Sequence, residues 1–150
     1  MTVKALGGKD FDCFIGDKMV HVIEASVKIT DGRKAKKVRG ITKGFVDGPV
    51  DAEVTIKLDH ENFLLVQEQA ASAGSWKGIE PFDISFLAEV DAGKKNVEAF
   101  GVLPQLDDVL SFKAEGGEED VTTIKGLVTS SDFVKINGIP YLTEDEVRDL

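Results

Sequence analysis

Residues 50–74 read VDAEVTIKLDHENFLLVQEQAASAG, and the spacing of the apolar side chains changes within this stretch. Over residues 50–58 apolar and polar residues alternate, which predicts a half-buried β-strand. From Phe63, apolar residues recur at the third, seventh and tenth positions after it, which is the spacing of one helix face. Asp59 suits the N-cap of that helix and Gly74 its left-handed stop. The stretch therefore predicts a strand that leads into a helix ending near Ala73.

Short alternating segments separated by Gly and Asp predict that the rest of the chain is antiparallel β structure. The predicted strands lie at residues 11–16, 19–29, 41–47, 81–90, 95–103, 121–128 and 132–136. We expect a turn of helix at 105–110, a turn at 137–140, and a short acidic helix or tail at 143–150, where Thr143 and Glu146 have capping-box spacing. These segments predict one domain over residues 1–150, with about seven to nine strands and one packed helix.

The composition is that of an ordinary soluble globular protein, with 42% hydrophobic and 30% charged residues. The apolar runs are too short to span a bilayer and the first residues lack an apolar core, so we expect neither a membrane anchor nor a signal peptide. Cys13 is the sole cysteine, which agrees with assembly in a reducing cytoplasm. The net charge of −9 argues against a general binder of nucleic acid or anionic membranes.

The sequence contains no group of residues with recognisable catalytic or metal-binding spacing. Cys13 and His21 would make a thiol and a base, but no third residue stands at a spacing that would orient them. His60 falls in the first turn of the predicted helix, as a surface histidine does. The histidines and the cysteine do not have zinc-ligand spacing, and the acidic residues of the predicted loop at 115–120 do not have EF-hand spacing. We therefore expect no enzyme activity, no metal and no cofactor.

One short segment carries a third of the positive charge. Six of the 18 basic residues fall within residues 33–43: Arg33, Lys34, Lys36, Lys37, Arg39 and Lys43. The other 139 residues hold 12 basic against 27 acidic residues, a net charge of −15. We expect an extended basic loop over 31–44, with three interpretations. It is a solvated loop, a phosphate-binding segment, or an arm that binds the acidic body of another copy of the chain.

Five passages carry a resemblance to known proteins. They are FDCFIGDKMVHVIEASVKITD (11–31), GITKGFVDGPVDAEVTI (40–56), SAGSWKGIEPFDISF (72–86), KKNVEAFGVLP (94–104) and TSSDFVKINGIPYL (129–142). Over residues 9–142 the chain resembles the tail tube proteins of contractile-tailed phages and phage-tail-like particles. The runs GSWKGIEPFD and DFVKINGIPYL are the strongest parts of this resemblance, and they contain no chemistry.

The resemblance implies a mainly β fold, an antiparallel β-sandwich or barrel with one flanking α-helix, like the type VI secretion tube protein. It implies a structural subunit of the inner tube in the virion tail, which self-assembles into stacked homohexameric rings that form a hollow conduit or needle. The implied partners are further copies of the chain, the tail sheath protein, and baseplate and tape-measure proteins, with DNA only as transiting cargo. The six basic residues of 33–43 would then contact the neighbouring ring.

An acidic lumen would let DNA pass, because like charge opposes phosphate binding. The candidates for facing the lumen alternate with apolar residues on two predicted strands: Asp51, Glu53, Lys57, Asp83 and Glu89. The alternative function is a small nucleic-acid-binding module that uses residues 33–43, and it predicts salt-sensitive DNA binding.

Overall fold

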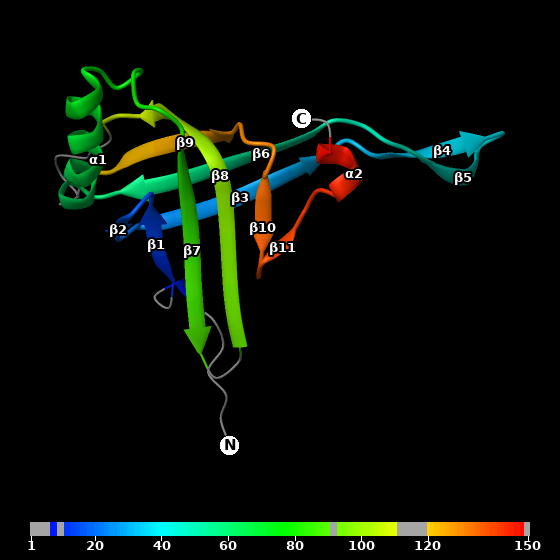
Figure 1. Cartoon of the computed structure of the whole chain (residues 1–150), viewed down its shortest axis with the longest axis horizontal. Coiled ribbons are helices and arrows are strands. Elements are labelled where there is room, and N and C mark those ends of the chain that lie inside the picture. The colour runs from blue at the N-terminus through cyan, green and yellow to red at the C-terminus, as the bar shows by residue number, and fades with distance from the viewer. Residues whose placement is uncertain (1–6, 9–10, 91–92, 111–119, 149–150) are drawn as a thin grey trace, which may run out of the picture.

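The structure is a computed structural model that describes residues 7–8, 11–90, 93–110 and 120–148. Most of these residues belong to strands (Figure 1). The elements, in chain order, are β1 (Asp12–Ile15), β2 (Lys18–Val20), β3 (Glu24–Asp31), β4 (Lys34–Val38), β5 (Ile41–Val46), β6 (Val50–Leu58), α1 (His60–Ala73), β7 (Phe82–Val90), β8 (Gly93–Asp108), β9 (Thr122–Val128), β10 (Val134–Ile136), β11 (Ile139–Pro140) and α2 (Glu144–Val147).

Nine strands form one sheet, and β4 and β5 form a separate hairpin. The hydrogen-bonded order is β2-β1-β7-β8-β9-β6-β3, with β10 beside β8 and β11 beside β10, and these pairings are antiparallel. The first half of β8 pairs with β7 and the second half with β9, so β8 belongs to two layers. In Figure 1, β7 and the first half of β8 run steeply across the direction of β3, β6 and β9.

The change of layer occurs at Gly101, in the middle of β8. Its φ of 62° lies in the left-handed region that favours glycine, and a Cβ there would approach the backbone nitrogen of Ser130 to 2.8 Å. The ladder with β7 shifts register beside it, between Phe82 and Ile84, which is a bulge that bends the strand. A single sheet is thereby folded over its own core.

The core lies between the two layers and is closed at one end by α1. The apolar positions of β6 from Ala52 to Leu58 are all buried, as the alternation over 50–58 predicts. They form one cluster with Ile84 and Phe86 of β7 and with Val66 of α1. Burial of each such side chain contributes roughly 1.5–3 kcal/mol, which makes this cluster the main source of stability.

The helix predicted from residues 59–74 is confirmed at both ends. α1 begins after Asp59, whose side chain accepts a hydrogen bond from the backbone N–H of Asn62 at 2.9 Å. It ends at Gly74, whose φ of 85° is left-handed. The capping box predicted near the end of the chain is also present, because the side chains of Thr143 and Glu146 accept hydrogen bonds from each other's backbone N–H groups at the start of α2.

Two predicted elements differ in the structure. The strand expected over 19–29 is divided into β2 and β3, because the chain changes layer at residues 21–23 and the N–H of Ile23 bonds the carbonyl of Lys57 at 2.8 Å. The turn of helix expected at 105–110 is wrong, because β8 continues to Asp108 and pairs Leu106 with Ile124 of β9. A partner strand satisfies the backbone groups there, and this outweighs local preference. Most of the acidic loop expected at 115–120 lies outside the described residues.

The basic segment is not the extended loop expected over 31–44. β3 runs to Asp31, and β4 and β5 then pair as a hairpin. Arg39 and Gly40 form its turn with φ values of 51° and 79°, and two positive φ values are typical of the turns that match the twist of paired strands. The sequence does not indicate β4 as a strand, because the segment contains four basic residues, Lys34, Lys36, Lys37 and Arg39, and Lys is depleted in strands.

Candidate assembly surfaces

β4, β5 and their turn form an arm, residues 34–46, which projects from the body at the end of the molecule opposite α1 (Figure 1). Every residue of its two strands is exposed. A two-stranded hairpin is marginally stable at best when it is alone in water. The arm is therefore suited to binding a surface outside its own chain.

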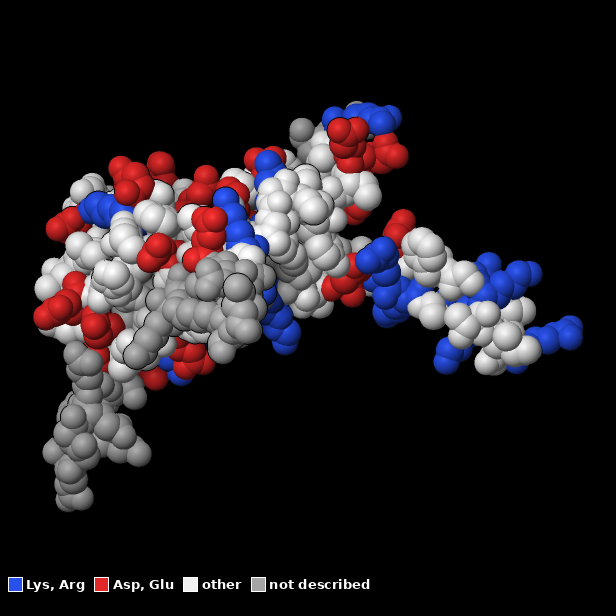
Figure 2. All heavy atoms as spheres, turned by 90° about the horizontal axis from the view of Figure 1, so that it is seen from below, with Lys and Arg blue, Asp and Glu red and all other residues white. Residues whose placement is uncertain are grey.

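The arm carries five of the six basic residues that sequence analysis assigns to inter-ring contact: Lys34, Lys36, Lys37, Arg39 and Lys43. Figure 2 shows Lys and Arg along the arm and many Asp and Glu over the body. The sixth residue, Arg33, lies at the base of the arm, where its guanidinium pairs with the carboxylate of Asp31 at 2.8 Å. The charges of the molecule are thus separated along its long axis.

The arm also exposes apolar side chains, a contact surface that the sequence did not indicate. Ile41 is 72% exposed and Phe45 is 67% exposed, and Val38 and Val46 are exposed as well. Val38 lies directly opposite Ile41 in the ladder, so these two form a cross-strand pair beside the turn. Apolar residues exposed on a projecting hairpin indicate a contact surface that is more than electrostatic.

The base of the arm is held by a cluster of three side chains. The single Nε–H of Arg33 is shared between the two carboxylate oxygens of Asp31, at 3.1 and 3.0 Å, and the hydroxyl of Tyr141 donates to the same carboxylate at 2.6 Å. Arg33 first and Tyr141 second hold the pKa of Asp31 well below its usual range. Because Tyr141 follows β11, the cluster ties the arm to the C-terminal segment.

Two glycines bring the chain segments of the arm base together. The N–H of Gly32 bonds the carbonyl of Pro49 at 2.8 Å, and a Cβ at Gly48 would lie 2.2 Å from the carbonyl oxygen of Gly32. There is no room for a side chain at this crossing. The close approach fixes where β4 and β5 leave the body.

The strands that lead into the arm belong to a four-stranded half of the sheet, made of β3, β6, β9 and the second half of β8. Among the described residues, β3 pairs only with β6, so its other edge is open. The ladder between β7 and β8 stops at Val102, so in the described part of the chain residues 103–108 pair on one side only, with β9. Pro104, which has no backbone N–H, lies in that second open edge, as proline in a strand usually does.

The five candidate lumen residues lie on two strands that are not neighbours: Asp51, Glu53 and Lys57 on β6, and Asp83 and Glu89 on β7. In the sheet order β8 and β9 separate these strands, so the structure does not bring the two sets together. The face of β6 turned away from the core carries charges of both signs, with Asp51 and Glu53 towards its start and Lys57 near its end. Lys57 pairs with Glu24 at 3.2 Å, and Lys28 lies opposite Glu53 in the ladder.

Cys13 and His21, the thiol and the base considered for chemistry, lie in different environments. Cys13 is 2% exposed, and burial raises the pKa of its thiol to about 12, so the thiol stays protonated near neutral pH. His21 lies exposed in the segment between β2 and β3. In the parts of the chain that the structure describes, no three His, Cys, Asp or Glu side chains are grouped as metal ligands. Within those same parts, no helix is long and apolar enough to cross a membrane.

Comparison with known sequences covers nearly the whole chain. The family model "Bacteriophage HP1, Orf24" matches residues 9–142. A protein of Haemophilus phage HP1 (strain HP1c1), described as "Putative tail tube protein", is 37% identical over 148 residues, which are 99% of this chain and 99% of that protein.

Two solved structures have similar folds. A chain in the tube-terminating cap of the anti-feeding prophage matches with a TM-score of 0.69 and 18% identity, over 91% of this chain and 93% of that one. A chain in the extended sheath-tube complex of PVC, an extracellular contractile injection system, matches with a TM-score of 0.62 and 16% identity, over 86% and 88% of the two chains. These likenesses confirm the predicted fold, which is mainly antiparallel β with one flanking helix.

Proposed function

The chain belongs to the Bacteriophage HP1, Orf24 family, and from this membership we propose that it is the subunit of the inner tail tube of a phage or phage-tail-like particle. Copies of it assemble into stacked homohexameric rings in the tail. Its role is structural rather than enzymatic. The sheath, baseplate and tape-measure proteins are its further partners, and DNA is cargo that passes through. Family membership favours this function over the nucleic-acid-binding module.

The arm is the observation that carries the proposal. Its strands are exposed along their whole length, and it projects from the body at the end opposite α1 (Figure 1). Its basic residues contact the negatively charged body of a subunit in the next ring. Opposite charges at the two ends of one molecule favour head-to-tail contact, which extends without limit and so makes a tube rather than a closed pair. The six basic residues of 33–43 are the proposed inter-ring contacts, with Arg33 acting at the base.

The two open edges of the four-stranded half supply the contact within a ring. Strand directions alternate through β8, β9, β6 and β3, so β3 of one copy can lie antiparallel to β8 of the next. Joining open edges in this way continues the sheet from copy to copy and leaves no edge unpaired once the ring closes. The face of these strands turned away from the core then lines the lumen, with Asp51, Glu53 and Lys57 on it. Asp83 and Glu89 lie off this surface.

An arm-less variant tests the stacking role. In it, an Asn-Gly pair replaces residues 34–46, so that β3 and β6 are joined by a short loop made of residues 32–33, the Asn-Gly pair and residues 47–49. Because the arm residues are exposed and contribute nothing to the core, we expect an unchanged melting temperature. Negative-stain microscopy and mass measurement should show tubes for the parent chain and separate rings for the variant.

A matched control removes charge without touching the arm. Lys28→Ser with Lys94→Ser takes two exposed positive charges from the body, and this variant should still form tubes. Arm-less tubes as long as those of the parent chain would show that stacking does not use the arm. A parent chain that stays monomeric and is absent from the tails of the producing particles would rule out the tube function itself.

A further inference from the structure

We propose that the loop of residues 75–79, the tryptophan loop, inserts into an apolar cleft along β3 of the neighbouring copy in the ring. This inference rests on the proposed tube function and names the residues of its lateral contact. It assigns a role to the passage SAGSWKGIEPFDISF, which contains no catalytic or metal-binding pattern.

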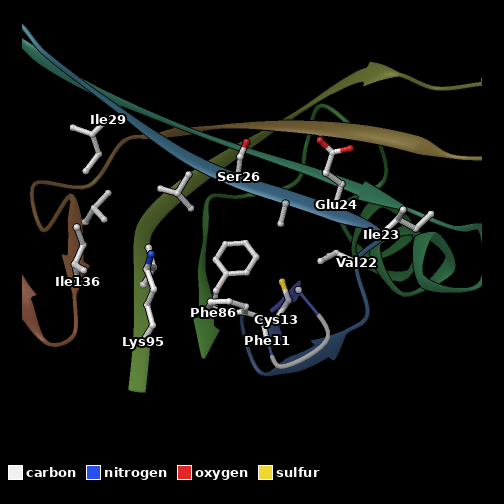
Figure 3. A pocket seen from close by; sticks show the side chains of 15 residues that line it. Phe11, Cys13, Val22, Ile23, Glu24, Ser26, Ile29, Phe86, Lys95 and Ile136 are labelled. Carbon is white, nitrogen blue, oxygen red and sulfur yellow. The ribbon is translucent and has the colours of Figure 1, made fainter. Parts of the chain in front are cut away.

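The acceptor is a cleft of about 540 Å³ between β3 and the layer of β1, β7, β8 and β10 (Figure 3). Phe86 and Ile136 line it from that layer, and Ala25, Val27 and Ile29 line it from β3. These three β3 residues lie opposite core residues of β6 in the ladder, so their side chains point to the core side of the sheet. None of the three is fully buried, because the cleft beside them is open.

A second apolar cleft, of about 400 Å³, lies at the other open edge of the same four strands. Trp76 and Ile79 of the tryptophan loop line it together with Pro104 and Leu106 of β8. Leu106 lies opposite the buried Ile124 of β9, so this cleft is also on the core side of the sheet. The two clefts therefore open on the same side, one at each edge.

The tryptophan loop is held in shape before any partner binds. The ring of Trp76 stacks on Phe63 of α1 with centroids 5.1 Å apart and planes 10° apart. The backbone N–H of Gly78 donates to Oγ of Ser75 at 2.9 Å, and a Cβ at Gly78 would approach that oxygen to 2.7 Å. Ser75 and Gly78 thus fix the turn that presents a half-buried Trp76. A fixed aromatic side chain loses little conformational entropy on binding, which is why tryptophan is frequent at the centre of interfaces.

Closing the ring brings these two surfaces together. Neighbouring strands lie about 4.8 Å apart, so pairing β3 of one copy with residues 103–108 of the next places the second cleft directly beside the first. Rotational symmetry keeps the core side of the sheet the same in every copy. The contact also brings together opposite charges, because Glu80 follows the tryptophan loop while Lys95 lines the β3 cleft.

Cross-linking in assembled protein tests the contact. Cysteines are introduced as Lys77→Cys with Ala25→Cys, because Ala25 lines the cleft on the core side of β3, and a short bismaleimide is added to rings or tubes. We expect covalent ladders of subunits at high yield, and none from either single variant, since the native Cys13 is buried. The control is Lys77→Cys with Glu53→Cys, because Glu53 lies on the opposite face of the same sheet. Equal ladders from the control, or assembled protein without ladders from the first pair, would overturn the inference and leave the tube function standing.

Two further measurements separate a contact within rings from one between them. Trp76 is the sole tryptophan, so its emission should shift to shorter wavelength and resist acrylamide quenching as rings form, including rings of the arm-less variant. Ala25→Lys should raise the concentration needed for half-assembly about tenfold or more, because it places an unpaired charge in the cleft. Thr30→Lys, on the outer face of the same strand, should not. A shift in Trp76 emission that appears only when rings stack would contradict the inference. A chain that never assembles would contradict both the inference and the tube function.

Discussion

Asp31 shows how one carboxylate can set the position of a whole hairpin. It ends β3, and it receives hydrogen bonds both from Arg33, at the start of the arm, and from Tyr141, more than a hundred residues further along the chain. In the sequence Arg33 groups with the other basic residues, because nothing in the local sequence reveals that its partner is two positions away rather than in another ring. The distant Tyr141 follows only from the fold.

The charge state of Asp31 should affect how the stability of the fold depends on pH. Arg33 and Tyr141 lower the pKa of Asp31, so the cluster should stabilise the folded state above the ordinary aspartate pKa of about 4 and lose this contribution as the pH falls through the lowered value. Carboxyl-carbon NMR should place the midpoint of Asp31 below that ordinary value. Arg33→Gln should raise the midpoint more than Tyr141→Phe does. Equal or reversed effects would contradict the order of these interactions.

At the scale of the element, the close approach of Gly32 and Gly48 at the base of the arm can be tested. In Gly48→Ala the new methyl group would meet the carbonyl oxygen of Gly32 at 2.2 Å, so the two segments must move apart. We expect the body to keep its melting temperature to within a few degrees, while stacking into tubes falls severalfold because the arm points elsewhere. Asp47→Ala, one position away on an exposed residue, should stack as the parent chain does. An unimpaired Gly48→Ala would show that the arm orients itself on its partner.

Elements could be predicted from the sequence wherever the local signals agreed. The end residues of α1 follow from Asp59, the helical spacing and Gly74, because each of these acts within a few residues. The hairpin of the arm could be predicted only in part, because the strand expected at 41–47 is present as β5 whereas β4 was expected to be loop. Lys is a poor strand former, and the turn at Arg39 and Gly40 becomes recognisable only when both strands are known. The extension of β8 to Asp108 likewise depends on β9, a partner more than a dozen residues away.

At the scale of the whole molecule, the assembly surfaces come from topology rather than from any motif. Edges are open on β3 and on the second half of β8 because of the order of the strands, and a sequence gives strands without their order. The separation of charge was visible in the sequence as a basic segment against an acidic remainder. The apolar part of the arm was not, because Ile41 and Phe45 would be buried in most strands, whereas here they are 72% and 67% exposed.

The arm therefore offers two kinds of contact, and salt distinguishes them. Between about 0.1 M and 1 M salt the Debye length falls from about 10 Å to about 3 Å, so attraction between basic arm and acidic body is largely screened. Lys34→Ser with Lys37→Ser should slow the stacking of purified rings, followed by light scattering, at low salt and match the parent chain at high salt. Ile41→Ser with Phe45→Ser should weaken stacking at both, because burial of apolar surface is not screened. Thr42→Ser, on the same strand, is the matched control. If the apolar double variant stacks as well as this control, the arm binds through charge alone; if the lysine variant is unimpaired at low salt, its charges do not guide the arm to the next ring.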